Sequence, residues 1–182
     1  MATCIQTLRP NVSQDEALRK FSAMGLGALY RRVRIGPLRR IAGVYVPFFL
    51  YRVRYELARA PQTRFFAIDA VDGSLDLFEF PTVPNGAQLI EVETRNCLPI
   101  GLMQQHAQAV LREKVLRIIF QQGFFKLQES HLECTHETLE LHLPYWLAFY
   151  GYETPRCRVL DAVRRRIEGA KASAFFEEWL AA

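Results

Sequence analysis

The sequence predicts an α+β fold in which two repeats, each a helix plus an antiparallel β-meander, pack as one compact pseudo-symmetric body with a C-terminal helix. Two observations lead to this prediction. The stretch YVPFFLYRVRY, which begins at Tyr45, is echoed by HLPYWLAFYGY from His142, and Pro47 aligns with Pro144. Each stretch is followed by an apolar run that contains Asp-Ala-Val, once at residues 69–71 and again at residues 161–163. Two matches in the same order indicate an internal repeat.

The first helix is predicted from a capping signal at Ser13. Glu16 follows three residues later, so that the two side chains can satisfy the free amides at a helix start. The buried face should carry the apolar residues at helical spacing, which are Leu18, Phe21, Met24 and Ala28.

The second helix is predicted within the run QQHAQAVLREKVLRIIFQQG, and Gly123 is its expected C-terminal cap. Each helix should lead into a strand, YRRVRI in the first half and FFKLQESHLEC in the second. The apolar face of this second helix should contain Ala107, Val110, Leu111, Ile118 and Ile119.

The aromatic strand that follows should be buried on both faces near Pro47. Side chains alternate along a strand, so Phe48 and Leu50 share one face. The other face should carry Phe49, Tyr51, Val53 and Tyr55. Such aromatic residues favour strands and fill cores between sheets and helices, which is the interpretation we prefer over a stacking surface for ligands.

After Asp-Ala-Val the two halves differ. In the first, Asp72-Gly73 predicts a tight hairpin turn, with Leu75 and Leu77 alternating in the next strand. In the second, we expect Arg164 and Arg165 to turn the chain, RIE to form a short strand and AKASAFFEEWL to form the closing helix. A continuous helix from Asp161 is the alternative, and Gly169 disfavours it because glycine is costly inside a helix.

The predicted organisation is a first repeat at residues 1–80, a packed connection at 81–102 and a second repeat with the closing helix at 103–182. The connection is rich in proline and glycine but contains AQLIEVET, which alternates enough to form a short strand.

The layout, and the hairpin RFFAIDAVDGSLDLFEF in particular, resembles the helix-plus-meander domains of the PepSY and cystatin-like type. This resemblance implies an inhibitory or scaffolding role and not catalysis.

Composition fits a folded protein, because half of the 182 residues are hydrophobic and the net charge is only +4. We expect neither a secretory signal nor a membrane span, because no apolar stretch is long enough. The four cysteines form no CxxC pair, and without an export signal this favours reduced thiols in a cytoplasm. We expect a cytoplasmic, bacterial protein.

Charge is unevenly distributed. The segment 31–64 carries nine arginines and one acid, and the segment 65–94 carries six acids and no base. We interpret these segments as neighbours that neutralise each other across the meander, with Arg52 and Arg54 near carboxylates of residues 69–79. A nucleic-acid surface, on which arginine contacts phosphate and aromatic rings stack on bases, is the alternative. The candidate residues for binding a ligand or partner are Arg52, Arg54, Tyr51, Tyr55, Tyr150 and Tyr152.

Metal binding has candidates in Cys134, His136 and His142, which share strand parity. No standard zinc spacing is present, so exposed histidines on a hairpin are the interpretation that we favour, and no cofactor is expected.

Catalytic motifs are missing: the sequence contains no GxSxG, HExxH or glycine-rich phosphate loop. Asp69 and Asp161 are the candidate catalytic pair, since two close carboxylates can share a proton. An aspartate before a turn more often caps that turn through its side chain. We therefore expect a non-enzymatic binding or scaffolding protein for a protein or small-ligand partner. A nucleic-acid-associated module and an enzyme of another type are the alternatives.

Overall fold

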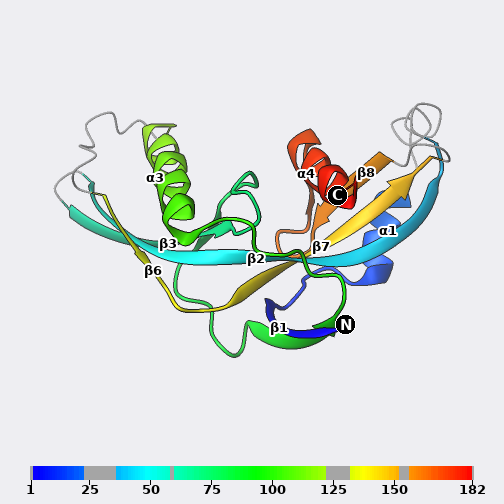
Figure 1. The fold of residues 1–182 in the computed structure, drawn as a ribbon, viewed down its shortest axis with the longest axis horizontal. Helices are drawn as coiled ribbons and strands as arrows, with labels where there is room; N and C mark the ends of the chain where they lie inside the picture. The colour runs from blue at the N-terminus through cyan, green and yellow to red at the C-terminus, as the bar shows by residue number, and fades with distance from the viewer. Residues whose placement is uncertain (1, 23–35, 58–59, 122–131, 152–155, 182) are drawn as a thin grey trace.

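The computed structural model describes residues 2–22, 36–57, 60–121, 132–151 and 156–181. In these ranges the fold is α+β, with a large, mostly antiparallel sheet and three helices, the last of them C-terminal (Figure 1). The helices are α1 (Gln14–Ser22), α3 (Gln104–Gln121) and α4 (Ala170–Ala181). The strands are β1 (Thr3–Leu8), β2 (Leu38–Leu57), β3 (Ala60–Asp69), β4 (Phe78–Phe80), β5 (Leu89–Thr94), β6 (Glu133–His136), β7 (Leu141–Tyr150), β8 (Arg156–Asp161) and β9 (Arg166–Ile167).

A long antiparallel ribbon forms the middle of the molecule. β2 is 20 residues long and runs across the whole view in Figure 1. It pairs with β7 along its first half, from Leu38 opposite Tyr150 to Phe48 opposite Leu141. Further along, the same edge of β2 pairs with β6. β2 therefore joins parts of the chain that lie about a hundred positions apart.

The other strands extend this ribbon in both directions. The main sheet order is β4-β3-β2-β7-β1-β5, and β8 pairs with β7 and then with the short β9. β1 and β5 are antiparallel over all six of their residues. The predicted strand AQLIEVET is thus confirmed as β5, whereas β1 was not expected from the sequence.

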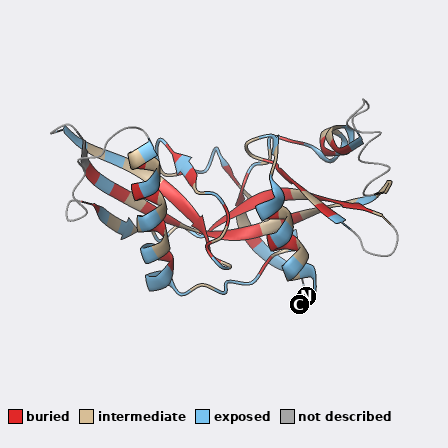
Figure 2. Cartoon of the chain, turned by 90° about the horizontal axis from the view of Figure 1, so that it is seen from above, coloured by how far each residue is buried: buried red, intermediate tan, exposed pale blue. Residues whose placement is uncertain are grey.

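The core confirms the predicted faces of the aromatic strand. Phe48 and Leu50 belong to a central cluster that also receives Phe176 of α4. Tyr51, Val53 and Tyr55 belong to a separate cluster on the opposite face. The middle of the ribbon is buried, as the red stretches of Figure 2 show.

Each of the first two helices covers strands that lie far from it in the sequence. α3 packs Leu111 and Val115 against the Tyr51 face of β2 and against β3. α1 packs Ala17 and Phe21 against Tyr150 of β7 and against β8. α1 also packs against Leu38 and Ile41 of β2, and α3 against Cys134 of β6, so each helix contacts strands from both parts of the chain.

The predicted capping box of α1 is confirmed: Ser13 N donates to Glu16 Oε2 over 3.0 Å and Glu16 N to Ser13 Oγ over 3.3 Å. Phe21 is buried as expected, but Leu18 is 45% exposed, because the buried positions are Ala17 and Phe21, one turn apart. Met24, Ala28 and the run YRRVRI lie outside the described residues.

The second helix follows its prediction closely. Ala107, Leu111 and Ile119 are buried, and Val110 and Ile118 pack at the edge of the same cluster. Gly123 and most of the run FFKLQESHLEC lie outside the described residues, and the last part of that run enters β6.

The hairpin expected after the first Asp-Ala-Val is present, because β3 and β4 are antiparallel, but Asp72-Gly73 does not form a two-residue turn between them. The chain makes a wide turn over residues 70–77, and the returning strand β4 begins only at Phe78, where it pairs with residues 65–67 of β3. The turn is wide because amides along it bind one buried carboxylate, described below. In the second half the hairpin prediction is confirmed: β9 follows the turn at residues 162–165, and α4 begins at Ala170.

Candidate functional site

Asp69, at the end of β3, organises the wide turn. It is fully buried, and its Oδ1 accepts hydrogen bonds from Asp72 N (3.1 Å) and Gly73 N (2.9 Å). Its Oδ2 accepts a third bond from Leu75 N (2.8 Å). Burial raises the pKa of this carboxyl, and the three backbone bonds oppose that rise.

Asp161, at the end of β8, has fewer partners. Its Oδ1 accepts hydrogen bonds from Val163 N (2.8 Å) and Arg164 N (2.7 Å). Its Oδ2 is buried without a hydrogen-bond partner among the described residues, and Arg164 Nε lies 3.9 Å away. Burial raises the pKa of Asp161 as well. Both candidate catalytic aspartates thus cap the turns that follow them.

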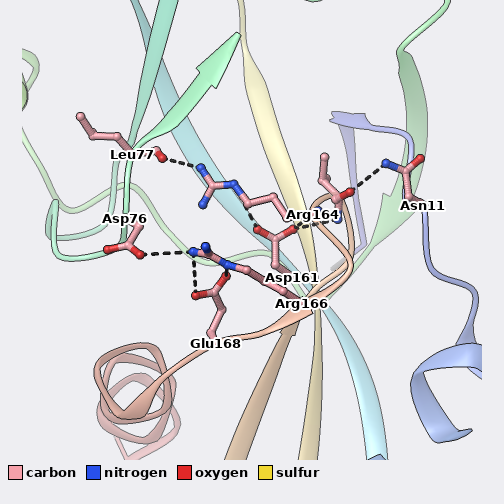
Figure 3. A network of polar contacts seen from close by, with 8 residues as sticks. Asn11, Asp76, Leu77, Asp161, Arg164, Arg166 and Glu168 are labelled. Atoms are coloured by element: carbon pink, nitrogen blue, oxygen red, sulfur yellow. Dashed lines mark hydrogen bonds and ion pairs between the residues drawn. The ribbon is translucent and has the colours of Figure 1, made fainter. Parts of the chain in front are cut away.

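A cavity of about 120 Å³ lies beside these turns. Its walls come from the turn after β3, from β7, from the residues after β8 and from the start of α4. Residues far apart in the sequence therefore meet around it, and Figure 3 shows part of their polar network. The lining residues are Leu75, Asp76, Tyr145, Arg164, Glu168, Gly169, Lys171 and Ala172.

Arg164 connects the second half of the chain to the first. Its guanidinium carbon lies 3.5 Å from the centre of the Phe78 ring, a cation–π contact. Its Nη2 also donates a hydrogen bond to the carbonyl oxygen of Leu77 (Figure 3). These contacts fix the guanidinium at the edge of the cavity.

Two carboxylates are held on the other side of the network by Arg166. Arg166 Nε lies 2.9 Å from Glu168 Oε1, and Arg166 Nη2 lies 3.3 Å from Asp76 Oδ2 (Figure 3). The hydrogen bond with Glu168 raises the pKa of Arg166. Asp76 and Glu168 are therefore brought together although 92 positions separate them in the chain.

The remaining polar groups near the cavity are two lysines and a phenol. Lys114 Nζ donates to the carbonyl oxygen of Leu75, and burial, followed by the charge of Lys171, lowers its pKa. Tyr145 is 4% exposed, and burial raises its pKa well above the ordinary value, so the phenol is neutral. Its hydroxyl makes no hydrogen bond to a described residue. The cavity thus offers donors and acceptors, with charges of both signs.

The predicted binding tyrosines are mostly structural. Tyr51 is fully buried and donates to the carbonyl oxygen of Gln104 over 3.0 Å. Tyr150 donates to the carbonyl oxygen of Phe21 over 3.0 Å. Tyr55 is buried in the cluster under α3, and Tyr152 lies outside the described residues.

The expected ion pairs of Arg52 and Arg54 with the acidic strand are wrong. Arg52 lies 2.8 Å from Glu137, in the link between β6 and β7. Arg54 is exposed, and no carboxylate of the described residues lies within ion-pair distance of it. The reason is register: the residues of β3 opposite these arginines are Phe65 and Thr63.

One pair between the basic and acidic segments does form. Arg64 lies 2.6 Å from Glu79 on the neighbouring β4. Arg31, Arg32, Arg34 and Arg59 lie outside the described residues.

The candidate metal ligands are not brought together. His136 of β6 lies edge-on to the rings of Phe49 and Tyr51, whereas His142 lies on β7, opposite Pro47. His142 is buried, its Nδ1 lies 3.0 Å from the Gln6 carbonyl oxygen, and burial lowers its pKa. Cys134 is half-buried on β6. Within the described ranges, no group of three or more potential ligands could hold an ion.

The cavity residues were missed by the sequence analysis. The run RRRIEGAK was assigned only to a turn, a short strand and a helix start. The feature of this run that could have indicated a site is the arginine, glutamate and lysine around Gly169, because they place positive and negative side chains together at a helix N-terminus.

No protein-family model, curated protein or solved structure matches this chain, so the resemblance to PepSY and cystatin-like domains stays a prediction. Among the helices that the structure describes, none has the length and apolar character needed to cross a bilayer.

Proposed function

We propose that the protein is a non-enzymatic binding protein that takes a small polar ligand in the cavity at the junction of two pseudo-symmetric halves. The observation that carries the proposal is the cavity itself, whose walls combine fixed charges of both signs with a buried phenol. Concave sites with a few convergent polar groups are the usual form of ligand pockets.

The register of the central ribbon supports the pseudo-symmetric part of the proposal. Val46 and Leu143, which are equivalent in the sequence alignment of the halves, lie directly opposite each other. A twofold axis between two antiparallel strands would produce this pairing, because it exchanges each residue with its equivalent.

The flanking strands support it too. Phe48 lies opposite Asp69, and its counterpart Tyr145 lies opposite Asp161. The amides that follow behave alike: Ala70 N donates to Pro47 O over 2.8 Å, and Ala162 N donates to Pro144 O over 3.1 Å. Under this interpretation the cavity lies where the two Asp-Ala-Val turns approach each other.

The test is a ligand screen by thermal shift on three proteins. Ala172→Leu extends a buried side chain into the cavity, and Ala181→Leu makes the same change at an exposed position of the same helix. A ligand that stabilises the wild type and Ala181→Leu, but not Ala172→Leu, supports the proposal. If a diverse screen yields no stabilising compound, or if Ala172→Leu responds like the wild type, the cavity is not the binding site.

A further inference from the structure

We propose that the ligand of this cavity is a small carboxylate with a neighbouring hydroxyl or ammonium group, that is, a 2-hydroxy or 2-amino acid of about six non-hydrogen atoms. This inference rests on the proposed function and adds the chemical class of the ligand. It is carried by the hydrogen-bond donors and acceptors around the cavity and by the cavity volume.

The main donors lie at the N-terminus of α4. Gly169 precedes the helix and has no side chain to cap it, and the first turn contains no acidic residue. The amides of Ala170, Lys171 and Ala172 make no hydrogen bond to a described residue. A helix start with free amides attracts a carboxylate through those amides and through the helix dipole. The ammonium group of Lys171 adds a positive charge at the same place.

Tyr145 points to the same ligand independently of the helix. Its side chain lines the cavity, is 4% exposed, and carries a hydroxyl without a hydrogen-bond partner in the described part of the chain. A carboxylate bound in the cavity would accept a hydrogen bond from this hydroxyl.

The acceptors are Asp76 and Glu168, and Glu168 lies directly before Gly169 at the start of α4. Arg166 holds both, but a carboxylate can accept about four hydrogen bonds, so each retains capacity for a ligand hydroxyl or ammonium. Their negative charges disfavour a dianion such as phosphate. A ligand carboxylate that has a hydroxyl or ammonium group beside it can bind the donors and these acceptors together.

The volume limits the size of the ligand. An apolar cavity of about 150 Å³ in another protein accepts benzene, which has six non-hydrogen atoms. The cavity here is slightly smaller, at about 120 Å³. Two- or three-carbon acids such as lactate and alanine match this space.

The experiment is a titration of the ¹⁵N-labelled protein, followed by the amide signals of residues 169–172. The probes are L-lactate, L-alanine, acetate and inorganic phosphate. We expect saturable shifts with lactate or alanine, and binding about tenfold weaker for acetate, which lacks the second donor. The stronger of lactate and alanine identifies the donor as hydroxyl or ammonium.

Three variants locate the binding groups. Tyr145→Phe removes only the hydroxyl and Lys171→Gln only the charge, and each should weaken binding by about tenfold. Arg19→Gln, which removes a charge on the exposed side of α1, should bind like the wild type. If Tyr145→Phe and Lys171→Gln bind the ligand as tightly as the wild type, the proposal is overturned, and either variant suffices if the other does not fold.

The outcomes separate this inference from the proposed function. Amide shifts as strong with acetate or phosphate as with lactate and alanine would overturn the ligand class. The ligand class would also be wrong if none of these probes moves the signals but another compound from the thermal-shift screen does. In that case the proposed function, ligand binding in the cavity, would remain supported. If no compound moves these signals, both proposals fail.

Discussion

The two Asp-Ala-Val turns begin alike and end differently. In both, the aspartate is buried at the end of a strand, and its Oδ1 accepts two backbone amides. In the first turn the Oδ2 of Asp69 also accepts a hydrogen bond from Leu75 N. In the second turn the Oδ2 of Asp161 accepts none from a residue that the structure describes, and Arg164 Nε lies 3.9 Å away. The first turn therefore contains more residues around its carboxylate before the chain re-enters the sheet.

This difference shows that a shared motif fixes only the start of a turn. The eight residues after Asp69 close around the carboxylate and satisfy it. The four residues after Asp161 turn back directly into β9, so that one oxygen is left over and the side chain of Arg164 extends toward the first half. The shorter turn makes room for the charged groups that line the cavity.

The largest expected effect comes from replacing each aspartate with asparagine. In Asp69→Asn, the new NH₂ group would face an amide donor whichever way it is oriented, so we expect a loss of about 3 kcal/mol. Asp161→Asn can keep its oxygen on the two amides and place the NH₂ at the free position, which should cost about 1 kcal/mol or less. Urea unfolding measures both. Equal losses would mean that the two turns are energetically equivalent.

The next effect concerns the backbone of each turn. Gly73 has a φ of 73°, and an added Cβ would lie 3.3 Å from Leu102 Cδ2, so Gly73→Ala should cost about 1–2 kcal/mol. Arg165 occupies the same region with a φ of 61°, so Arg165→Gly relieves strain and should leave stability within about 1 kcal/mol of the wild type. Thermal unfolding of the two variants compares the turns. A neutral Gly73→Ala would show that the first turn is not tightly packed.

A smaller effect is expected in the dependence of stability on pH. Burial raises the pKa of Asp69 and Asp161 above the ordinary value of 3.8. The folded state then holds these protons more tightly than the unfolded state. The resulting stabilisation is complete below about pH 3.8 and is lost as the pH rises through the folded-state pKa.

Asp161→Asn removes one of these titrations. Relative to the wild type, this variant should become more stable as the pH rises from about 4 to about 6, and urea unfolding across this range measures the difference. A difference that does not change with pH would show that burial does not shift the titration of Asp161.

The smallest expected effect on stability concerns the arginine-rich surface, and it tests whether this surface binds a partner in place of the cavity. The pair of Arg52 with Glu137 is partly exposed, with 37% and 21% of the two side chains accessible, so Arg52→Ala should cost only about 0–1 kcal/mol. We expect no salt-sensitive binding of single-stranded or duplex nucleic acid by the wild type. Fluorescence anisotropy at low and moderate salt tests this. Micromolar binding that falls steeply with salt and is lost in the Arg52→Ala, Arg54→Ala double variant would favour the nucleic-acid function instead.

The parts of the fold that depend on local chemistry could be predicted from the sequence. The capping box at Ser13, the two faces around Phe48 and the strand before α4 follow from spacing and side-chain type. Strand β1 was missed because TCIQTL alternates only weakly and is stabilised by pairing with β5, far along the chain. The partner of Arg52 was mistaken for a similar reason, since the β3 register places Phe65 opposite it and Glu137 arrives from another strand.

The candidate site was harder to predict, because its parts meet only through tertiary packing. The side chains of Asp76 and Glu168 look like ordinary surface acids in the sequence. Their common contact, Arg166, lies on a two-residue strand whose position depends on the turn at Arg165. Sequence patterns report local periodicity, and no periodicity links these residues.

The long strand β2 also has a consequence for how the chain is made. Ribosomes add about 5–20 residues per second, and residues 58–150 must follow β2 before its partner β7 is complete. For roughly 5–20 seconds the nascent chain therefore holds β2 with an unpaired edge. The face that α3 covers stays open for the first part of this interval, until α3 has been made. Such an edge is a template for pairing with other chains. Slow translation between the two halves would prolong this interval, so the protein should depend on chaperones that shield nascent strands.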